Sequence, residues 1–336
     1  MSSNCRSAAE TRASVLALYP GPISVHNLVM AQLENFRLKV FRMVAVHLNF
    51  HKAAEHLFLT QPAVTLQIKA LEQDLGVRLF NRAAGSISLT GQGAILLDYA
   101  GKMAALAAEA EQELDCKEGK VSGQLSLGVS TTIAQYILPR LLGAFLADYP
   151  AVEFSLRSGN TSDIVQLLLD VKVAIGLIEG PARARGIRSE PFMQDELVLI
   201  APQYFEVDHL SGNQLMASSL LMRERGSGSR RVVETALEKA GFKLRSFSKV
   251  MEMDSTEAIK SAVEAGLGIA FVSRWAIAKE LELGTLKVGQ VIGVKLARQF
   301  TLVTRTGPEP HGPAGALREF ALGRARLFSN SARKPL

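Results

Sequence analysis

The sequence predicts an N-terminal all-α winged helix-turn-helix with a long linker helix, followed by an α/β domain of two lobes. Three observations lead to this fold class. Residues 33–93 contain three helical patterns, at about 33–47, near 53–57 and at 61–75, and then two alternating runs around a glycine-containing turn. An alanine-rich helical stretch follows. From Ser122 onward, strand patterns alternate with helical ones.

The best-defined element is the helix over residues 61–75. Its apolar residues recur at the helical spacing i, i+4, i+7 and i+11, at Val64, Ile68, Leu71 and Leu75. Thr60 is a suitable N-cap, Pro62 lies in the first turn where a missing N–H costs little, and Gly76 follows the last turn. Both ends of the helix are therefore defined by the sequence.

The opposite face of this helix carries the chemistry that reads base edges. Gln61 can bond adenine bidentately and Thr65 can serve either partner, while Leu66 can pack on a thymine methyl. A lone helix face of this kind is more simply explained as solvated surface, but its place in a helix-turn-helix favours DNA contact. The expected DNA-binding residues are Gln61, Pro62, Thr65 and Leu66, with Lys69 and Arg82 on phosphates.

A wing and a long helix complete the N-terminal part. Two short alternating runs, residues 77–80 and 87–89, flank the turn at Gly85 and predict the wing. Thr90 then caps a helix that runs to about Cys116. Because its alanines give it a thin profile, we expect it to pack against a second copy, and a dimer would place two reading heads on a symmetric operator.

Composition fits these domains. At 336 residues, 48% hydrophobic and 21% charged, the chain has room for two or three domains with sizeable cores. The net charge is only +6, and residues 33–93 hold seven basic and four acidic side chains, which suits sequence reading more than nonspecific coating of DNA. Cys5 and Cys116 lie far apart without metal-ligand spacing, so we expect neither a disulfide nor a metal, and no cofactor.

The first 29 residues fit no element. A short apolar run ends at Tyr19-Pro20-Gly21-Pro22, so a secretory signal is not expected, and Met30 lies just before the first helical pattern. We interpret residues 1–29 as a disordered extension or a misassigned start. No window of about 18 uninterrupted apolar residues indicates a membrane span, and a cytoplasmic location is expected.

The second half alternates strands and helices. Strands are expected at 125–129, 152–156 and 173–178 in a first lobe, and at 197–200, 220–222, 250–253 and 269–273 in a second lobe that starts near Pro191. One helix is expected from Ser130 to Tyr149, another over 164–169, and a last one over 313–328 closes the first lobe. Mostly parallel sheets are predicted.

Three turns after these strands indicate a ligand site. They are rich in hydroxyl groups and glycine, and their N–H groups at helix N-termini favour an anion such as a carboxylate, phosphate or sulfur oxyanion. Capping alone would explain each turn taken singly; their equivalent positions in two lobes favour an effector site. The expected effector-binding residues are Ser130, Thr131, Thr132, Asn160, Thr161, Arg223, Ser227, Gly228, Ser229 and Arg230.

The motifs together resemble the LysR-type transcriptional regulators. The resemblance rests on Leu59-Thr60-Gln61-Pro62-Ala63-Val64-Thr65, Leu79-Phe80-Asn81-Arg82, Arg223-Glu224, Gly226-Ser227-Gly228 and Ala265-Gly266-Leu267-Gly268. It implies a DNA-binding domain at 30–90, a linker helix at 91–120 and, at 121–330, an effector domain similar to periplasmic binding proteins. It also implies a homodimer or homotetramer, contact with RNA polymerase and, more often than not, gene activation. Leu66 departs from the family pattern, where a basic residue is common.

The effector and two other protein classes stay open at this point. The segments 223–230 and 253–260 resemble the branch of sulfur-assimilation and carbon-fixation regulators, so a sulfur oxyanion, a phosphorylated sugar or a nicotinamide nucleotide are the alternatives. An enzyme is not expected, because no phosphate-loop lysine, carboxylate pair or Ser/His/Asp pattern accompanies the glycine-rich turn. A solute-binding protein would share the lobes but would need export and would have no use for a helix-turn-helix.

Overall fold

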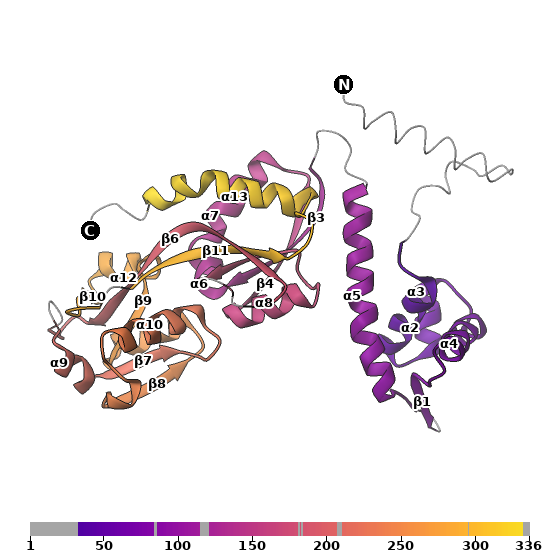
Figure 1. Cartoon of the computed structure of the whole chain (residues 1–336), viewed down its shortest axis with the longest axis horizontal. Helices are drawn as coiled ribbons and strands as arrows, with labels where there is room; N and C mark the ends of the chain where they lie inside the picture. Colours follow the sequence, from indigo (N-terminus) through magenta and orange to yellow (C-terminus); the bar gives the residue numbers. More distant parts are fainter. Residues whose placement is uncertain are drawn as a thin grey trace. The chain divides into compact units, whose positions relative to one another are not determined.

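The computed structural model describes residues 33–83, 86–114, 121–180, 182, 184–206, 210–294 and 296–331. The expectations for residues 1–29, Gly85 and Cys116 therefore lie outside the described residues. The chain divides into two compact units, with the boundary between Leu97 and Asp98 inside one long helix. The first unit is helical with a small hairpin, and the second is built from strands and helices (Figure 1).

The predicted helix-turn-helix, wing and linker helix are all present. They are α2 (Phe36–His47), α3 (Phe50–Leu57), α4 (Gln61–Leu75), β1 (Phe80–Ala83), β2 (Ser86–Leu89) and α5 (Gly91–Leu114). The first helix begins later than expected because the Asn35 side chain caps it, accepting hydrogen bonds from the N–H groups of Arg37 and Leu38. The Thr60 cap and the left-handed Gly76 confirm the predicted ends of α4.

The wing is tied to the helices by packing and by one carboxylate. Phe80 lies 5.5 Å from Phe41 and 5.9 Å from Phe50, measured between ring centroids. Glu72 on α4 accepts hydrogen bonds from the N–H groups of Leu79 at 2.7 Å and Phe80 at 3.3 Å. The wing and α4 are thus held in one fixed arrangement.

The second unit contains two lobes joined by long strands. Its elements are β3 (Gly123–Ser130), α6 (Thr131–Tyr136), α7 (Leu138–Asp148), β4 (Val152–Gly159), α8 (Thr161–Leu169), β5 (Ile175–Glu179), β6 (Ile187–Pro202), α9 (Gly212–Ala217), β7 (Ser219–Arg223), α10 (Gly228–Lys239), β8 (Lys249–Met253), α11 (Thr256–Glu264), β9 (Ile269–Ser273), the 3-10 turn η3 (Arg274–Ala276), α12 (Ala278–Leu283), β10 (Leu286–Gly289), β11 (Ala297–Arg305) and α13 (Gly312–Ser331).

The strand order is β4-β3-β5-β11-β6-β9-β7-β8, with β10 paired to β6. The pairs β3–β4, β3–β5, β7–β8 and β7–β9 are parallel, but β11 runs antiparallel to β5 and β6, and β6 antiparallel to β9 and β10. The expectation of mostly parallel sheets was therefore wrong for the centre of the unit, where antiparallel strands cross between the lobes.

The strand β6 passes from the first lobe into the second, so the second lobe begins later in the chain than expected. Residues 187–196 of β6 pair with β11 in the first lobe, and residues 197–200 pair with β9 in the second. Pro191, where we expected the second lobe to start, lies inside this strand opposite Thr301. Alternation in the sequence cannot reveal the change of lobe, because the strand continues without a break.

The single helix that we predicted after the first strand of this unit is in fact two helices. The stretch from Ser130 to Tyr149 divides at Ile137 into α6 and α7, and Pro139 lies in the first turn of α7. Proline has no N–H to donate and its ring clashes with the carbonyl four residues earlier, so a helix cannot run through this point unbroken.

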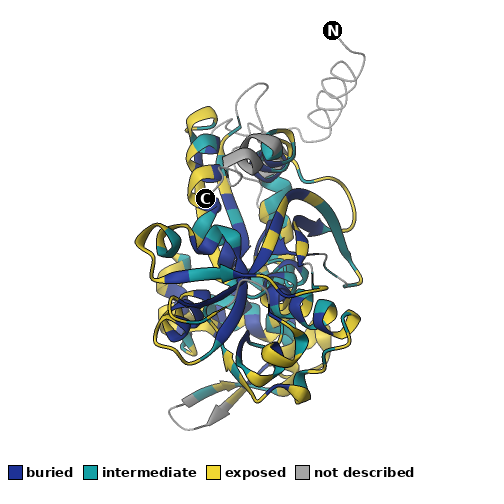
Figure 2. Ribbon diagram, turned by 90° about the vertical axis from the view of Figure 1, so that its left-hand side faces the viewer, coloured by how far each residue is buried: buried dark blue, intermediate teal, exposed yellow. Residues whose placement is uncertain are grey.

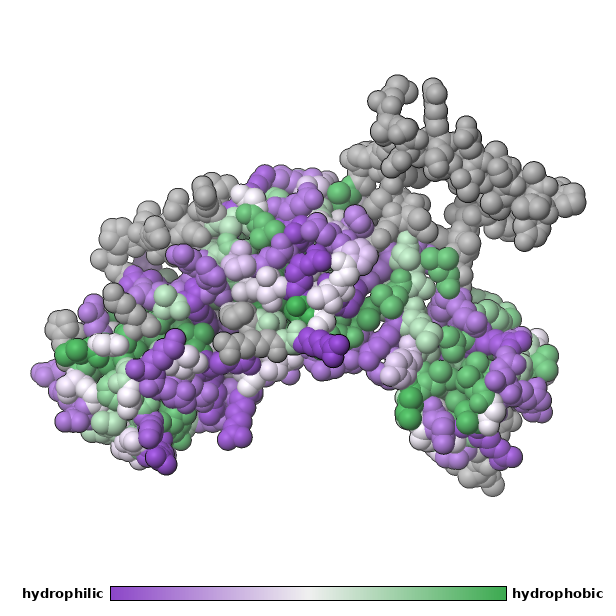
Figure 3. Space-filling model, viewed as in Figure 1, coloured by the Kyte–Doolittle hydropathy of each residue, from purple (hydrophilic) through white to green (hydrophobic). Residues whose placement is uncertain are grey.

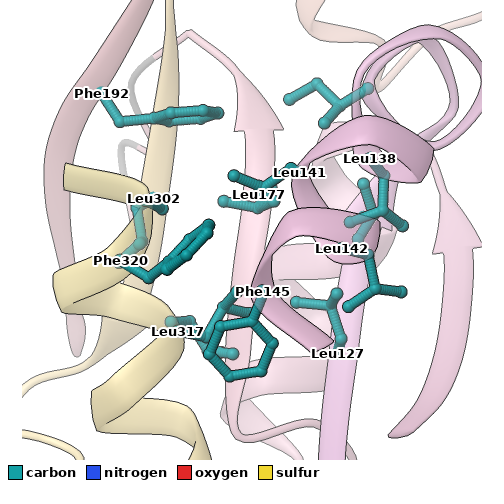
Figure 4. Close-up of a cluster of buried hydrophobic side chains, with 14 of the residues drawn as sticks. Leu127, Leu138, Leu141, Leu142, Phe145, Leu177, Phe192, Leu302, Leu317 and Phe320 are labelled. Atoms are coloured by element: carbon teal, nitrogen blue, oxygen red, sulfur yellow. The ribbon is translucent and has the colours of Figure 1, made fainter. Parts of the chain in front are cut away.

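Each lobe has its own hydrophobic core. In the first, α7 and α13 cover the sheet, and Phe145 meets Phe320 edge to face at 5.4 Å between centroids (Figure 4). In the second, Leu215, Leu220 and Leu237 belong to one core and Ile259, Val263 and Ala270 to another. The buried strands lie inside, and helices with exposed outer faces cover them (Figure 2).

Candidate DNA-binding and effector sites

The predicted base-reading residues of α4 lie on its exposed face. Gln61, Pro62 and Lys69 are exposed, and Leu66 keeps 65% of its surface. Thr65 is half-buried, and its hydroxyl donates to the backbone carbonyl of Gln61 at 3.0 Å. That bond uses the hydroxyl proton but leaves oxygen lone pairs for a base donor. Val64, Ile68 and Leu71 of the predicted apolar stripe are buried on the other side. The prediction was wrong for Leu75, which keeps 47% of its surface exposed at the last residue of α4.

The wing residue Arg82 lies in β1 opposite Ile87. Its side chain lies outside the described residues, so a phosphate contact there stays a prediction.

The helix α5 carries an apolar stripe that the sequence analysis did not identify. Its four large exposed residues are Ile95 (63%), Tyr99 (57%), Met103 (49%) and Leu106 (49%). Their spacing of four, four and three residues places them on one face of a helix. Hydrophobic residues reach the surface along α5 in Figure 3. The alanines of this helix predict its thin profile but do not indicate the apolar stripe.

The expected effector residues meet where the two lobes touch. We call the first turns of α6, α8, α10 and α11, with Tyr136 at the end of α6, the interlobe junction. On one side of it, the N–H and hydroxyl of Ser162 both lie 3.3 Å from the Gly226 carbonyl oxygen, to which they donate. On the other side, the Tyr136 hydroxyl donates to Glu257. These contacts join the first lobe to the second.

Some of the expected residues have structural roles at the junction. Asn160 caps α8 through the N–H groups of Ser162 and Asp163, and Ser227 caps α10. A Cβ on Gly228 would lie 2.1 Å from the Glu179 carbonyl oxygen and 2.6 Å from the Thr161 hydroxyl, so only glycine allows this approach. Capping and close packing explain these residues without a ligand.

Three other hydroxyls have no partner. The side-chain oxygens of Ser130, Thr131 and Thr161 are buried and make no hydrogen bond. Ser130 is 1% exposed and Thr161 is 3% exposed. A buried hydroxyl without a partner loses its hydration, so it is suited to meet the polar atoms of a bound ligand. These oxygens lie at the N-termini of α6 and α8, where an anion is favoured.

A buried ion network lies beside them. Arg298 lies opposite Asp195 in the crossing strands; its Nε donates to Asp195 at 2.6 Å and its Nη1 to Glu179 at 3.0 Å. Glu179 also accepts from the Thr132 N–H at 3.1 Å and from the Ser229 hydroxyl. The protein's own carboxylate therefore occupies two of the donors that we expected to face an effector.

The pKa values of the two carboxylates in this network are shifted in opposite directions. Burial raises the pKa of Glu179, but Arg298, Ser229 and Thr132 outweigh it and bring that pKa down to about 2. Burial also raises the pKa of Asp195, and there Arg298 and Ser273 do not compensate. Glu179 is thus the firmly ionised member of the network.

The two expected arginines are already paired. Arg223 is 5% exposed, and its Nε and Nη2 donate to Glu224 at 2.8 Å and 3.1 Å. Arg230 donates to Glu234 at 2.7 Å, to Glu252 and to the Arg223 carbonyl. Neither arginine presents a free guanidinium at the junction.

A large cavity of this unit extends away from the junction, where Glu179 and Gly228 line one part of it. It has a volume of about 1520 Å³ and is lined by the crossing strands, β10 and the Arg231–Ala240 part of α10. Gly228 lines it, but Ser130, Thr161 and Arg223 do not. A pocket of 300–1,000 Å³ is typical for small ligands, so this wide groove is a poor match for a small anion. We place the candidate site at the interlobe junction.

Several functional residues were missed from the sequence. Glu179, Asp195 and Arg298 are widely separated in the chain, and only the crossing strands bring them together. A signal was present, because Arg298 interrupts an apolar strand and Glu179 ends another. The sequence contains no such signal for Tyr136, Thr256 and Lys260, because each has the pattern of an ordinary helix residue.

Comparisons with known proteins agree with this arrangement. Residues 36–94 match the model of the bacterial regulatory helix-turn-helix protein, lysR family, and residues 118–326 match the LysR substrate binding domain. The chain belongs to the LysR family of transcriptional regulators. It is a DNA-binding regulator with an effector-binding domain, and its relatives are regulators and not enzymes.

The relatives of this LysR-type regulator are consistent with the carbon-fixation branch of the family. A RuBisCO operon transcriptional regulator of Allochromatium vinosum is 35% identical over 296 residues, which are 86% of this chain and 95% of the relative. CbnR in complex with its target DNA is similar in structure, with TM-score 0.60 and 25% identity over 88% of this chain and 98% of that one. The Synechocystis CcmR regulatory domain in complex with 2-PG has TM-score 0.56 and 25% identity over 61% of this chain and 98% of that domain.

Two further findings concern this LysR-type regulator. In the described ranges no helix has the length and apolar character needed to cross a membrane. Among the same residues, three or more His, Cys, Asp or Glu side chains do not gather as a metal set.

Proposed function

We propose that this LysR-type regulator reads the promoter of carbon-fixation genes and responds to a small phosphorylated anion bound at the interlobe junction. The observation that most directly supports this proposal is the set of three buried hydroxyls without a hydrogen-bond partner, on Ser130, Thr131 and Thr161. The 2-PG bound to the CcmR regulatory domain and the RuBisCO operon regulator among the relatives support the ligand class and the targets. A phosphate has the lone pairs that such donors require.

The proposal includes the assembly and location of the protein. The regulator acts in the cytoplasm as a homodimer or homotetramer, joined through the α5 stripe, and contacts RNA polymerase to activate transcription. The four exposed apolar residues of α5 support the dimer, because burying such a stripe against a second copy removes it from water. The DNA contacts of Gln61, Pro62, Thr65, Leu66, Lys69 and Arg82 belong to the same proposal.

Ligand-induced stabilisation tests the effector class. We would measure the melting temperature of the full chain with 2-phosphoglycolate, glycolate, sulfate, thiosulfate, a sugar bisphosphate and NADPH. A saturable rise with the phosphorylated acid and none with glycolate is expected, because stabilisation grows with ligand concentration over Kd. A rise with thiosulfate alone would assign the protein to sulfur chemistry instead.

Substitution of Ser130 locates the site. Ser130→Ala removes one of the unpartnered hydroxyls and is expected to weaken 2-phosphoglycolate binding about fivefold to tenfold, the value of one hydrogen bond. Isothermal titration gives the Kd. Ser246→Ala, in the turn before β8, is the matched control. Equal Kd values for Ser130→Ala and the wild type would remove this turn from the site.

A further inference from the structure

The buried and half-buried cations around the interlobe junction share one property: each is paired with a carboxylate of the protein itself. Arg298 is paired with Glu179 and Asp195, Arg230 with Glu234 and Glu252, and Lys260 with Glu257 and Glu280. Arg223 is paired with Glu224. An anionic effector that enters this junction therefore meets hydroxyls and the unpartnered Nη2 of Arg298, but it gains the Arg223 guanidinium only by replacing the Glu224 carboxylate.

Arg223 is the cation placed to meet an effector. It ends β7, and its Nη1 donates to the Thr256 hydroxyl at 3.1 Å in the first turn of α11. The residue after Thr256 is Glu257, whose carboxylate accepts from the Tyr136 hydroxyl at the end of α6. Arg223 is thus close to the helix that carries the free hydroxyls of Ser130 and Thr131.

The Glu224 carboxylate holds Arg223 in the geometry that a ligand would take. Two parallel bonds, from Nε at 2.8 Å and Nη2 at 3.1 Å, form the bidentate pairing that guanidinium groups make with carboxylates and phosphates. Together with the Thr256 bond, it engages all three nitrogens of the guanidinium. Glu224 therefore occupies the position of an effector oxyanion.

Glu224 is more readily exchanged than Glu179. The Glu179 side chain is 2% exposed and is held by Arg298, Ser229 and Thr132. The Glu224 side chain is 19% exposed, and Arg223 is the partner that holds it. Leaving Arg223 returns Glu224 to water, where a carboxylate is well solvated, whereas Glu179 would have to leave a buried network.

We propose that Glu224 is an internal competitor of the effector: its carboxylate occupies Arg223 in the free protein, and an oxyanion must displace it to bind. The proposal rests on the proposed function, since it concerns the same site. It makes Glu224 a specificity-determining residue, because only a group that pairs with Arg223 better than a neighbouring carboxylate can bind. A doubly charged phosphate meets that condition more readily than a single carboxylate.

The competition has a measurable cost. Where the binding-competent state is only partly populated, the apparent Kd rises by the inverse of that fraction. Glu224→Gln keeps the size of the side chain and removes the charge, so it holds Arg223 less strongly. We expect this variant to bind 2-phosphoglycolate about tenfold more tightly than the wild type, since a neutral partner bonds roughly half as strongly.

The experiment compares four full-length proteins: the wild type, Glu224→Gln, Arg223→Gln and the control Glu238→Gln, which removes an exposed carboxylate from α10. Each is titrated with 2-phosphoglycolate, glycolate and inorganic phosphate. Trp275, the chain's single tryptophan, lies in η3 beside α6 and the crossing strands and reports binding by its fluorescence. Calorimetry gives the Kd independently.

Tighter binding by Glu224→Gln than by Glu238→Gln, with loss of binding in Arg223→Gln, supports the proposal. Binding by Glu224→Gln alone, where the wild type shows none, supports it as well. An unchanged or weaker Kd in Glu224→Gln overturns the proposal while the effector function stands, provided that the wild type binds. If neither protein binds any of the anions, both the internal competition and the anionic effector are wrong. Should Arg223→Gln fail to fold, the comparison of Glu224→Gln with Glu238→Gln still decides.

Discussion

Thr65 makes a hydrogen bond within α4 and is also one of the proposed DNA contacts. Its hydroxyl proton bonds the Gln61 carbonyl, which restricts the rotation of the hydroxyl and leaves the oxygen lone pairs without a proton donor from this bond. A hydroxyl that is already oriented loses little freedom on meeting a base. Thr65 is therefore better placed to read DNA than its half-buried position suggests.

Thr65→Ala should weaken specific DNA binding by about 1 to 3 kcal/mol if the hydroxyl accepts from a base edge. Nonspecific binding depends on phosphates and should not change. Fluorescence anisotropy with operator and scrambled DNA measures both. Thr235→Ala is a matched control, because that hydroxyl makes the same bond to the carbonyl four residues earlier, in α10. Equal losses on both DNAs would mean that Thr65 does not read sequence.

Glu179 is a buried carboxylate whose charge contributes to the stability of the second unit. Its pKa falls from a usual value near 4.5 to about 2, because Arg298 and two hydrogen bonds outweigh the effect of burial. A carboxylate with a lowered pKa stabilises the fold at pH values above its unfolded pKa. That stability disappears as the pH falls through the folded pKa.

Glu179→Gln should lower the free energy of unfolding at pH 7, by on the order of 3 kcal/mol, because Arg298 loses a buried partner. The difference from wild type should be complete above about pH 4.5 and shrink as the pH falls towards 2. Urea denaturation at pH 7, 5 and 3 gives the comparison. A difference that grows on acidification would contradict the assigned ionisation of Glu179.

At the scale of elements, α5 combines two functions. Thr90 caps its first turn at 2.9 Å through the Gly93 N–H, and a Cβ on Gly93 would lie 2.1 Å from the Leu79 carbonyl oxygen. The start of the helix is thereby joined to the wing. Further along, its apolar stripe faces solvent, which is unusual for a helix that has no second copy beside it.

Met103→Asp should dissociate the oligomer into monomers, because a carboxylate in the middle of the stripe would be buried without a partner. Ala108→Asp is the control: at 100° per residue it projects from the opposite face of α5. Sedimentation velocity at micromolar concentration distinguishes the species. An unchanged sedimentation coefficient for Met103→Asp would place the interface elsewhere.

At the scale of the α/β unit, two lobes meet through few polar contacts. Tyr136 reaches Glu257 on one side, and Ser162 reaches Gly226 on the other, with the free hydroxyls between the same helices. Because β6 is continuous through both lobes, bending of this strand would move one lobe against the other. Such an arrangement allows a ligand to shift the population of closed lobes.

Tyr136→Phe should weaken binding of 2-phosphoglycolate by about tenfold, since one hydrogen bond to a charged group no longer holds the lobes together. The ring, which lies 5.4 Å from the Lys260 ammonium, is retained. Tyr149→Phe changes a tyrosine packed on Phe145 within one lobe and serves as control. If both variants bind alike, closure does not depend on Tyr136.

The sequence by itself determined the local elements and the family. The stripe of Val64, Ile68 and Leu71, the Thr60 cap and the Gly76 turn specify α4, because these signals act over a few residues. The exposed face of α4 follows from the same periodicity. The motifs at 59–65 and 223–230 indicate the LysR-type regulators without reference to the fold.

Only the tertiary structure decided how the lobes are joined and which site atoms are free. Asp195 and Arg298 are 103 residues apart and pair because β6 and β11 cross between the lobes. Ser130 and Ser229 look alike in sequence, yet one hydroxyl has no partner and the other is bonded to Glu179. The physical reason is that hydrogen-bond satisfaction depends on atoms that fold together from distant strands, and no local pattern records them.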